Sequence, residues 1–126
     1  MTRIPEANVR IGVVSDTHNH LRNVRRIVEL FNAAAVDRVI HTGDITQAKT
    51  LEVFAGLEAE LFGVFGNNDL ERDALEDAAR RLGIRLADPP LSISWAGRRL
   101  LVVHDPHFLD AEVVSDHDVV LHGHTH

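Results

Sequence analysis

Cysteine is absent from this chain of 126 residues. Its absence excludes disulfide bonds, thiolate zinc sites and thiol nucleophiles together. Any metal ion must therefore be held by nitrogen and oxygen ligands. The nucleophile of any hydrolytic reaction must likewise be something other than a cysteine thiol.

Long apolar runs are absent as well. No stretch approaches the roughly 20 residues of a membrane-spanning helix, and residues 1–10 lack the apolar centre of a signal peptide. We therefore expect no membrane partner and a cytoplasmic location.

The chain also lacks an excess of positive charge. It has 13 Lys and Arg against 19 Asp and Glu, a formal net charge of −6, so a broad basic groove for nucleic acid is not indicated. A metal centre could still create a local positive field for an anionic small molecule. The length and the 44% share of hydrophobic residues predict one compact domain over residues 1–126.

Apolar patterning predicts alternating strands and helices up to Gly83. Residues 9–15 are nearly all apolar and β-branched, which is typical of a strand buried on both faces of a parallel sheet. Apolar residues at helical spacing predict a helix from Leu21. The same alternation continues with strand 36–41, helix 47–57, strand 59–65 and helix 71–82, capped near Gly83. Short crossovers of this kind imply a parallel, right-handed α/β arrangement.

The alternation of strands and helices stops after residues 88–90. Residues 91–95 and 98–104 flank Ala96-Gly97, which predicts a hairpin with Arg98 and Arg99 on its exposed face. Residues 113–114 do not decide between helix and strand, whereas residues 119–121 predict one more strand. A second, more antiparallel sheet is therefore expected.

Polar side chains follow the predicted strands, at the edge where open α/β sheets bind ligands. The five motifs are Asp16-x-His18, Gly43-Asp44, Gly66-Asn67-Asn68-Asp69, His104-Asp105 and Gly123-His124-x-His126. Each has a simpler explanation alone: a helix cap at Asp16 or Asn19, a Gly-Asp turn, a loop, or a terminal tag. All five in order, each after a strand, favour a metal site.

The motif order resembles the calcineurin-like metallophosphoesterase superfamily, particularly its small bacterial and archaeal phosphodiesterases. The resemblance spans Val9 to His126 and implies an α/β/β/α sandwich with a mainly parallel first sheet and flanking helices. It also implies two metal ions. By this resemblance Asp16, His18 and His126 bind one ion, Asn67, His104 and His124 bind the other, and Asp44 bridges them.

The residue chemistry agrees with that ligand set. Residues two apart on an extended backbone face one way, and glycines at 43, 66 and 123 allow close backbone approach. Oxygen donors mixed with imidazoles suit divalent transition metals, with manganese expected first and iron, zinc, cobalt or nickel as alternatives. The implied function is a metal-dependent phosphoesterase, and phosphodiesters are favoured over monoesters only by resemblance. A metal-bridging hydroxide would attack the phosphoester in line.

Two positions depart from the family pattern. Asn68 stands where many relatives carry a histidine, and an amide cannot act as a general acid at neutral pH. The catalytic candidates here are Asn68, the adjacent Asp69, and His20 as a substitute acid; a preference for substrates with good leaving groups is the other possibility. Asp105 replaces the usual glycine, and we interpret it as a turn residue rather than a support for His104.

Five further histidines and the C-terminal end of the chain have expected roles as well. His107 and His117 are expected to face solvent, while His20, His41 and His122 lie near enough to the motifs to support ligands or contact phosphate. Relatives continue after the His-x-His motif, so the sequence is expected to be C-terminally truncated, with an incomplete second sheet. An exposed sheet edge would favour a homodimer.

Two other function classes remain open. One is a non-catalytic protein-binding scaffold of the same fold, similar to the retromer small subunit, in which the ligand positions are degraded. The second is a plain α/β ligand-binding domain, which would make the motif order a coincidence. All seven implied ligands are present, which favours the enzyme.

Overall fold

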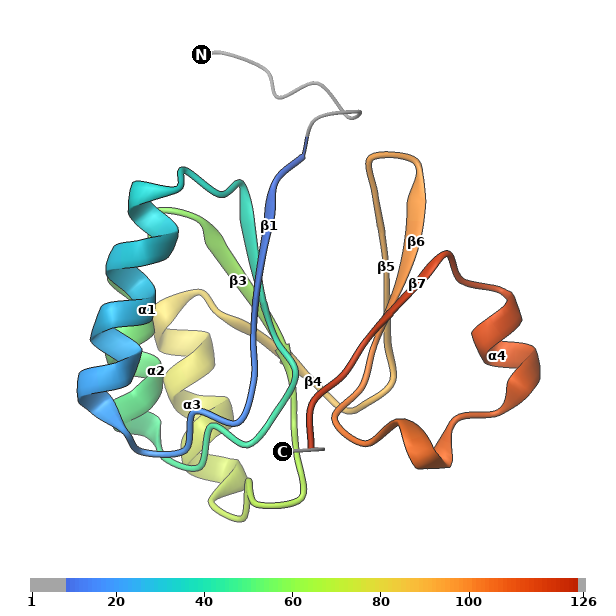
Figure 1. Ribbon diagram of the computed structural model, residues 1–126. Helices are drawn as coiled ribbons and strands as arrows, with labels where there is room; N and C mark the ends of the chain where they lie inside the picture. The colour runs from blue at the N-terminus through green and yellow to red at the C-terminus, as the bar shows by residue number, and fades with distance from the viewer. Residues whose placement is uncertain (1–8, 125–126) are drawn as a thin grey trace.

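Four layers make up the structure, a computed structural model that describes residues 9–124 (Figure 1). Helices α1 to α3 cover one side of a first sheet, a second sheet packs on its other side, and α4 lies beyond. The first sheet is parallel, with the order β1-β2-β3-β4. Its strands are β1 (Ile11–Val14), β2 (Arg38–His41), β3 (Glu60–Val64) and β4 (Arg85–Ala87). The helices are α1 (Leu21–Ala33), α2 (Ala48–Phe54) and α3 (Arg72–Leu82).

The second sheet has the order β5-β6-β7. Its hairpin pairs antiparallel strands, whereas β7 runs parallel to β6. The bounds are β5 (Leu91–Trp95), β6 (Arg98–Val102), the 3-10 turn η2 (Pro106–Phe108), α4 (Ala111–Ser115) and β7 (Val119–Leu121). The predicted hairpin is confirmed, and Arg98 and Arg99 are exposed.

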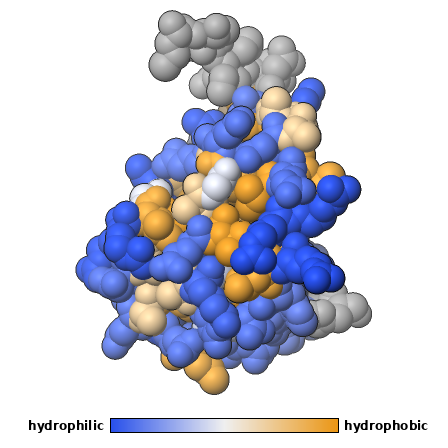
Figure 2. Space-filling model, turned by 90° about the vertical axis from the view of Figure 1, so that its left-hand side faces the viewer, coloured by the Kyte–Doolittle hydropathy of each residue, from blue (hydrophilic) through white to orange (hydrophobic). Residues whose placement is uncertain are grey.

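Two apolar clusters hold the layers together. Val24 and Val28 of α1 join Leu75 of α3 in the cluster between the helices and the first sheet. Ile40 of the first sheet packs with Leu100 of the second, in the cluster between the sheets. Because the inter-sheet cluster uses alternate residues of each strand, the opposite faces remain free for helices. On the helical side, hydrophilic residues dominate the surface, with one apolar area near the middle of the view and smaller ones around it (Figure 2).

Two local expectations were wrong, and one strand was not predicted. β1 is not buried on both faces: it is the edge strand of its sheet, and Val13 is 45% exposed. β4 is a fourth parallel strand beside β3 that the apolar pattern does not predict. The helix expected over residues 47–57 is shorter, because α2 ends at Phe54. Residues 113–114 lie in helix α4.

Strand register brings the predicted motifs to one end of the molecule. Val14 pairs with His41, and His41 pairs with Gly63, so three strands of the first sheet end side by side. In the second sheet, Val102 pairs with Leu121. The loops that follow these five strands therefore meet at one edge. No helix in the described range 9–124 has the length and apolar character needed to cross a membrane.

Candidate active site

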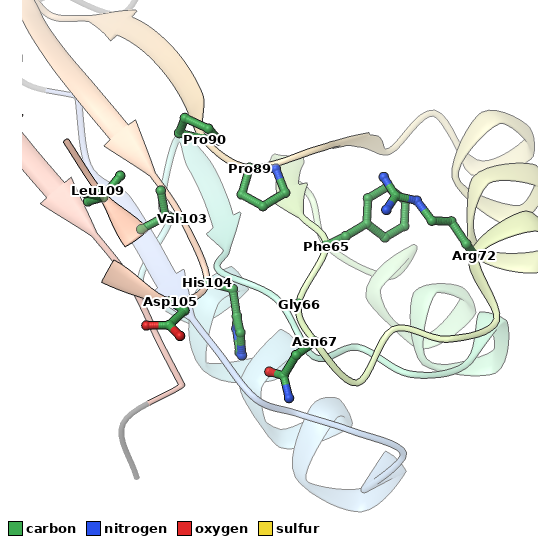
Figure 3. A pocket seen from close by; sticks show the side chains of 10 residues that line it. All are labelled: Phe65, Gly66, Asn67, Arg72, Pro89, Pro90, Val103, His104, Asp105 and Leu109. Carbon is green, nitrogen blue, oxygen red and sulfur yellow. The ribbon is translucent and has the colours of Figure 1, made fainter. Parts of the chain in front are cut away.

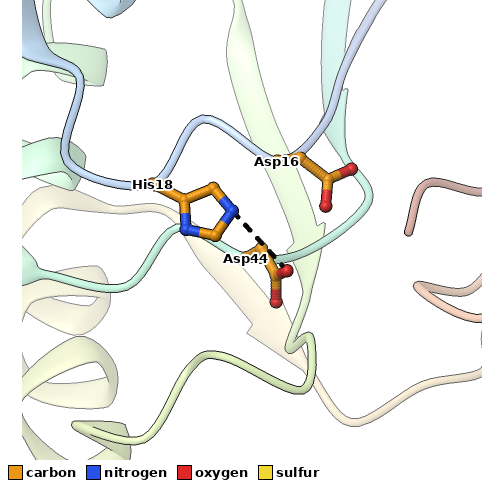
Figure 4. A group of neighbouring side chains, drawn as sticks. All are labelled: Asp16, His18 and Asp44. Carbon is orange, nitrogen blue, oxygen red and sulfur yellow. Dashed lines mark ion pairs between the residues drawn. The ribbon is translucent and has the colours of Figure 1, made fainter. Parts of the chain in front are cut away.

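Asp16, His18 and Asp44 form the first group of ligand-type side chains (Figure 4). One nitrogen or oxygen atom from each lies within 4.8 Å of those of the other two, so the group could hold a metal ion. His18 Nε2 is 3.8 Å from Asp44 Oδ2. Helix capping does not explain Asp16, because the N-cap of α1 is His20, which makes no side-chain capping bond.

A second group surrounds the same aspartate. His104 Nε2 lies 3.3 Å from Asp44 Oδ2, and His124 Nδ1 lies 3.2 Å from His104 Nε2. The same His124 nitrogen is 3.2 Å from Asn67 Oδ1. The structure thus brings together six of the seven predicted ligands, and the seventh, His126, lies outside the described residues. Their donor atoms, imidazole nitrogens with carboxylate and amide oxygens, suit a divalent transition metal.

Backbone conformation also marks this site. Seven described non-glycine residues have positive φ, and four of them are Asp16, His18, Asp44 and His124, with φ of 53°, 47°, 65° and 72°. This left-handed region is unfavourable for residues with a Cβ and is concentrated at functional sites. Backbone hydrogen bonds hold two of these loops together, from Asp16 N to the Gly43 carbonyl and from His18 N to the Asp44 carbonyl.

Asp44 is the most deeply buried acid of the site, at 1% exposure. Its Oδ1 accepts a hydrogen bond from Asn68 N, and its Oδ2 accepts one from Asn68 Nδ2, both at 2.9 Å. Within residues 9–124, no lysine or arginine forms an ion pair with it. A buried carboxylate next to imidazoles, without a basic side chain to balance it, is suited to a bound cation.

His104 is oriented by a backbone group. Its Nδ1 lies 3.0 Å from the carbonyl oxygen of Thr42, which can only accept a hydrogen bond. In the neutral imidazole this contact places the proton on Nδ1 and leaves the Nε2 lone pair directed at the site. Sequence reasoning missed this contact because a carbonyl oxygen leaves no signal in the residue type.

Asp69 lies beneath the ligand loops, at 6% exposure. Its Oδ2 accepts hydrogen bonds from Asp44 N at 2.9 Å and Gly66 N at 2.7 Å. Its Oδ1 accepts one from Thr46 N at 2.6 Å. Both oxygens are thus occupied by backbone donors, and the carboxylate joins the loop of Asp44 to the loop of Asn67.

His41 is completely buried beside the site. Its Nδ1 accepts a hydrogen bond from Gly43 N, and its Nε2 lies 2.9 Å from Thr17 Oγ1. Desolvation by burial lowers the pKa of His41 from 6.5 to about 3. A phosphate contact is excluded by the lack of exposure, so His41 supports the two ligand loops instead.

Asp105 has two neighbours among the histidines. Its Oδ1 accepts a hydrogen bond from His107 N at 3.0 Å, which confirms a turn residue and lowers the pKa of the Asp105 carboxyl. Its Oδ2 lies 3.7 Å from His124 Nε2. Asp105 therefore faces the outer nitrogen of His124 while the inner nitrogen faces Asn67.

Several candidate histidines lie outside the cluster. His20 and His122 are exposed, and the ring of His20 is 6.4 Å from that of His18. His107 faces solvent as expected. The expectation for His117 was wrong, because it is half-buried and its Nε2 lies 2.7 Å from Ser92 Oγ.

Gly66 provides the close approach that the ligands need. A Cβ added there would collide with Asp44 Oδ1 and would meet His104 Cγ at 3.0 Å. Only a residue without a side chain can therefore occupy this position without displacing two predicted ligands. The side chains and the backbone around them together fit a metal centre.

Comparison with known proteins gives the family. The calcineurin-like phosphoesterase superfamily domain matches residues 9–126. This chain belongs to that superfamily. A phosphodiesterase of Methanocaldococcus jannaschii is 34% identical over 122 residues, which are 94% of this chain and 74% of the relative. The superfamily assignment confirms the expected resemblance.

Solved structures agree with the fold. A novel archaeal phosphodiesterase has a TM-score of 0.79 and 32% identity, with 93% of this chain and 73% of that chain covered. A phosphoesterase from E. coli has a TM-score of 0.63 and 22% identity, with 82% and 60% covered. The sandwich of a parallel sheet, a second small sheet and flanking helices is therefore the phosphoesterase fold.

Proposed function

We propose that the chain hydrolyses phosphodiesters with the help of two divalent metal ions. The observation that carries this proposal is the position of Asp44, whose Oδ2 faces His18 on one side and His104 on the other. One carboxylate between two donor groups is the arrangement that two neighbouring cations require. In the proposal, Asp16, His18 and His126 hold one ion, Asn67, His104 and His124 hold the other, and Asp44 bridges them.

Two ions bound there would supply an activated water for in-line attack on phosphorus and would offset the charge of the phosphate. The chain's own residues keep the donors in place. The Thr42 carbonyl fixes the proton of His104, and the Asn68 amide holds Asp44. The preference for diesters over monoesters is supported by the phosphodiesterase relative.

The leaving group of the ester must gain a proton, and Asn68 and His20 are the residues to consider. The amide of Asn68 is engaged with Asp44 and cannot release a proton at neutral pH. His20 is the remaining candidate acid, because it is exposed and lies beside His18. We propose that the enzyme acts on esters with good leaving groups unless His20 supplies the proton.

Hydrolysis of bis(p-nitrophenyl) phosphate and p-nitrophenyl phosphate, with manganese added or chelated, tests the proposal. We expect manganese-dependent hydrolysis, faster for the diester, and a loss of about 100-fold or more in His124→Ala, which also binds manganese more weakly. His117→Ala is the matched control, because His117 precedes β7 at the end remote from the ligands. Activity that survives chelation, or equal activity of the two variants, would refute the proposal.

The same assay addresses His20. If His20 donates the proton, His20→Ala loses the high-pH limb of the pH-rate profile and is most impaired with poor leaving groups. An unchanged profile eliminates the substitute acid and leaves the preference for good leaving groups.

A further inference from the structure

A pocket of about 320 Å³ lies directly beside Asn67 and His104 (Figure 3). This volume is at the small end of the range for ligand sites, so it suits one group of a substrate rather than a large ligand. Its walls are mainly apolar. They include Phe65, Pro89, Pro90, Val103 and Leu109.

Arg72 is the arginine of the described pocket wall, and three contacts fix its position. Its guanidinium lies over the Phe65 ring, 3.9 Å from the ring centroid. It also forms ion pairs with Asp88 and with Glu76. With one face on Phe65 and its charge balanced by Asp88 and Glu76, the guanidinium brings little free charge to the pocket wall.

The pocket is continuous with the predicted ligands. Asn67 and His104 belong to both, and in Figure 3 their side chains point to the same side of the pocket. A phosphate held near these two residues would have one ester group within reach of the apolar walls. The pocket is thus placed to select among substrates of the same reaction.

We propose that this pocket binds an uncharged aromatic ester group of the phosphodiester substrate. The inference rests on the proposed function and adds the substrate class. A flat ring suits a narrow pocket whose walls include the Phe65 ring, and it gains from burial against proline and leucine. A saturated chain of equal length lacks the stacking surface.

A second phosphate group fits the same pocket poorly. Arg72 is already paired with Asp88, and the carboxylate of Asp105 also lines the wall. Another anion would meet that carboxylate without gaining a free cation, so charge complementarity is missing.

Binding to the manganese-loaded full chain, measured by calorimetry, tests the proposal. The probes are phenyl phosphate, methyl phosphate and ethane-1,2-diyl bisphosphate. Leu109→Trp fills the pocket from the loop between η2 and α4, and Leu109 belongs to neither core cluster. Leu30→Trp is the matched control, since Leu30 is a 51% exposed residue of α1.

We expect phenyl phosphate to bind about tenfold or more tightly than methyl phosphate to the natural protein and to Leu30→Trp. In Leu109→Trp the ratio should fall to near one, while methyl phosphate binds as before. A ratio near one in the natural protein would overturn the aromatic site. If the bisphosphate bound most tightly of the three probes, and Arg72→Met lost that affinity, the pocket would be an anion site instead.

Hydrolysis of methyl p-nitrophenyl phosphate by the natural protein reports the proposed function separately. Hydrolysis without phenyl selectivity would refute the aromatic pocket and support the proposed hydrolysis. Phenyl selectivity without hydrolysis would support the aromatic pocket and refute the proposed hydrolysis.

Discussion

Replacing Asp69 by asparagine tests how the two ligand loops are held together. The carboxylate accepts three backbone hydrogen bonds, from Asp44, Thr46 and Gly66. An asparagine keeps one acceptor oxygen, and its NH₂ group must face at least one backbone N–H. One charge-assisted bond is then lost, a donor opposes a donor, and the remaining bonds lose the charge of their acceptor.

The magnitude follows from these contacts. A hydrogen bond to a charged group contributes roughly 1.5–3 kcal/mol, and a buried donor left without a partner costs about as much. We expect Asp69→Asn to lower the free energy of unfolding by about 3 kcal/mol, or the melting temperature by roughly 10 °C. Because Asp69 joins the loops of Asp44 and Asn67, manganese affinity should fall about tenfold or more.

Urea unfolding of the metal-free protein gives the stability, and a manganese titration gives the affinity. Asp116→Asn is the matched control, because Asp116 is an exposed residue at the end of α4. If Asp69→Asn were no less stable than Asp116→Asn, or bound manganese as tightly, the reasoning about the loops would be wrong.

Two further predictions concern residues around the site. The pKa of His41 falls from 6.5 in the unfolded chain to about 3 in the fold, so between these values the unfolded chain binds the extra proton and stability falls as pH falls. The contribution is at most about 1.4 kcal/mol per pH unit, and it should be missing in urea titrations of His41→Gln; identical slopes in both proteins would contradict it. Gly43→Ala should cost about 2–4 kcal/mol in thermal unfolding, because a Cβ at φ 112° would lie 2.7 Å from His104 Nδ1. Gly83→Ala, at φ 72° with no atom within 4 Å, should cost about 1 kcal/mol, and equal costs would refute the crowding argument.

Most secondary structure was predictable, because it depends on local apolar spacing. The long helices and the hairpin of β5 and β6 agree with the expectations, and Gly83 caps α3 with φ of 72°. β4 and α4 were not assigned because they are short and mix charged or polar residues with apolar ones, whereas the equally short β7 is entirely apolar. The apolar residues of β1 predicted burial on both faces. Apolar content does not show whether a strand lies at the centre or at the edge of a sheet.

The candidate site was predictable in its residue types and less so in its contacts. Aspartates, histidines and an asparagine after successive strands indicated a metal site, since parallel strands end at the same edge. The support of Asp44 by Asn68, and of both loops by Asp69, was not readable, because the bonded groups are 24 or 25 residues apart. Asp69 therefore looked like a catalytic candidate, whereas its geometry supports a positioning role.

The sequence by itself determined the family, most of the elements in their order and the kinds of ligand, because these depend on local pattern and motif order. The tertiary structure decided which strand lies at the sheet edge, how His104 and Asp44 are oriented, and where the pocket beside Arg72 opens. Those features arise from contacts between backbone groups and side chains that come together only after folding, and residue type alone does not predict such contacts.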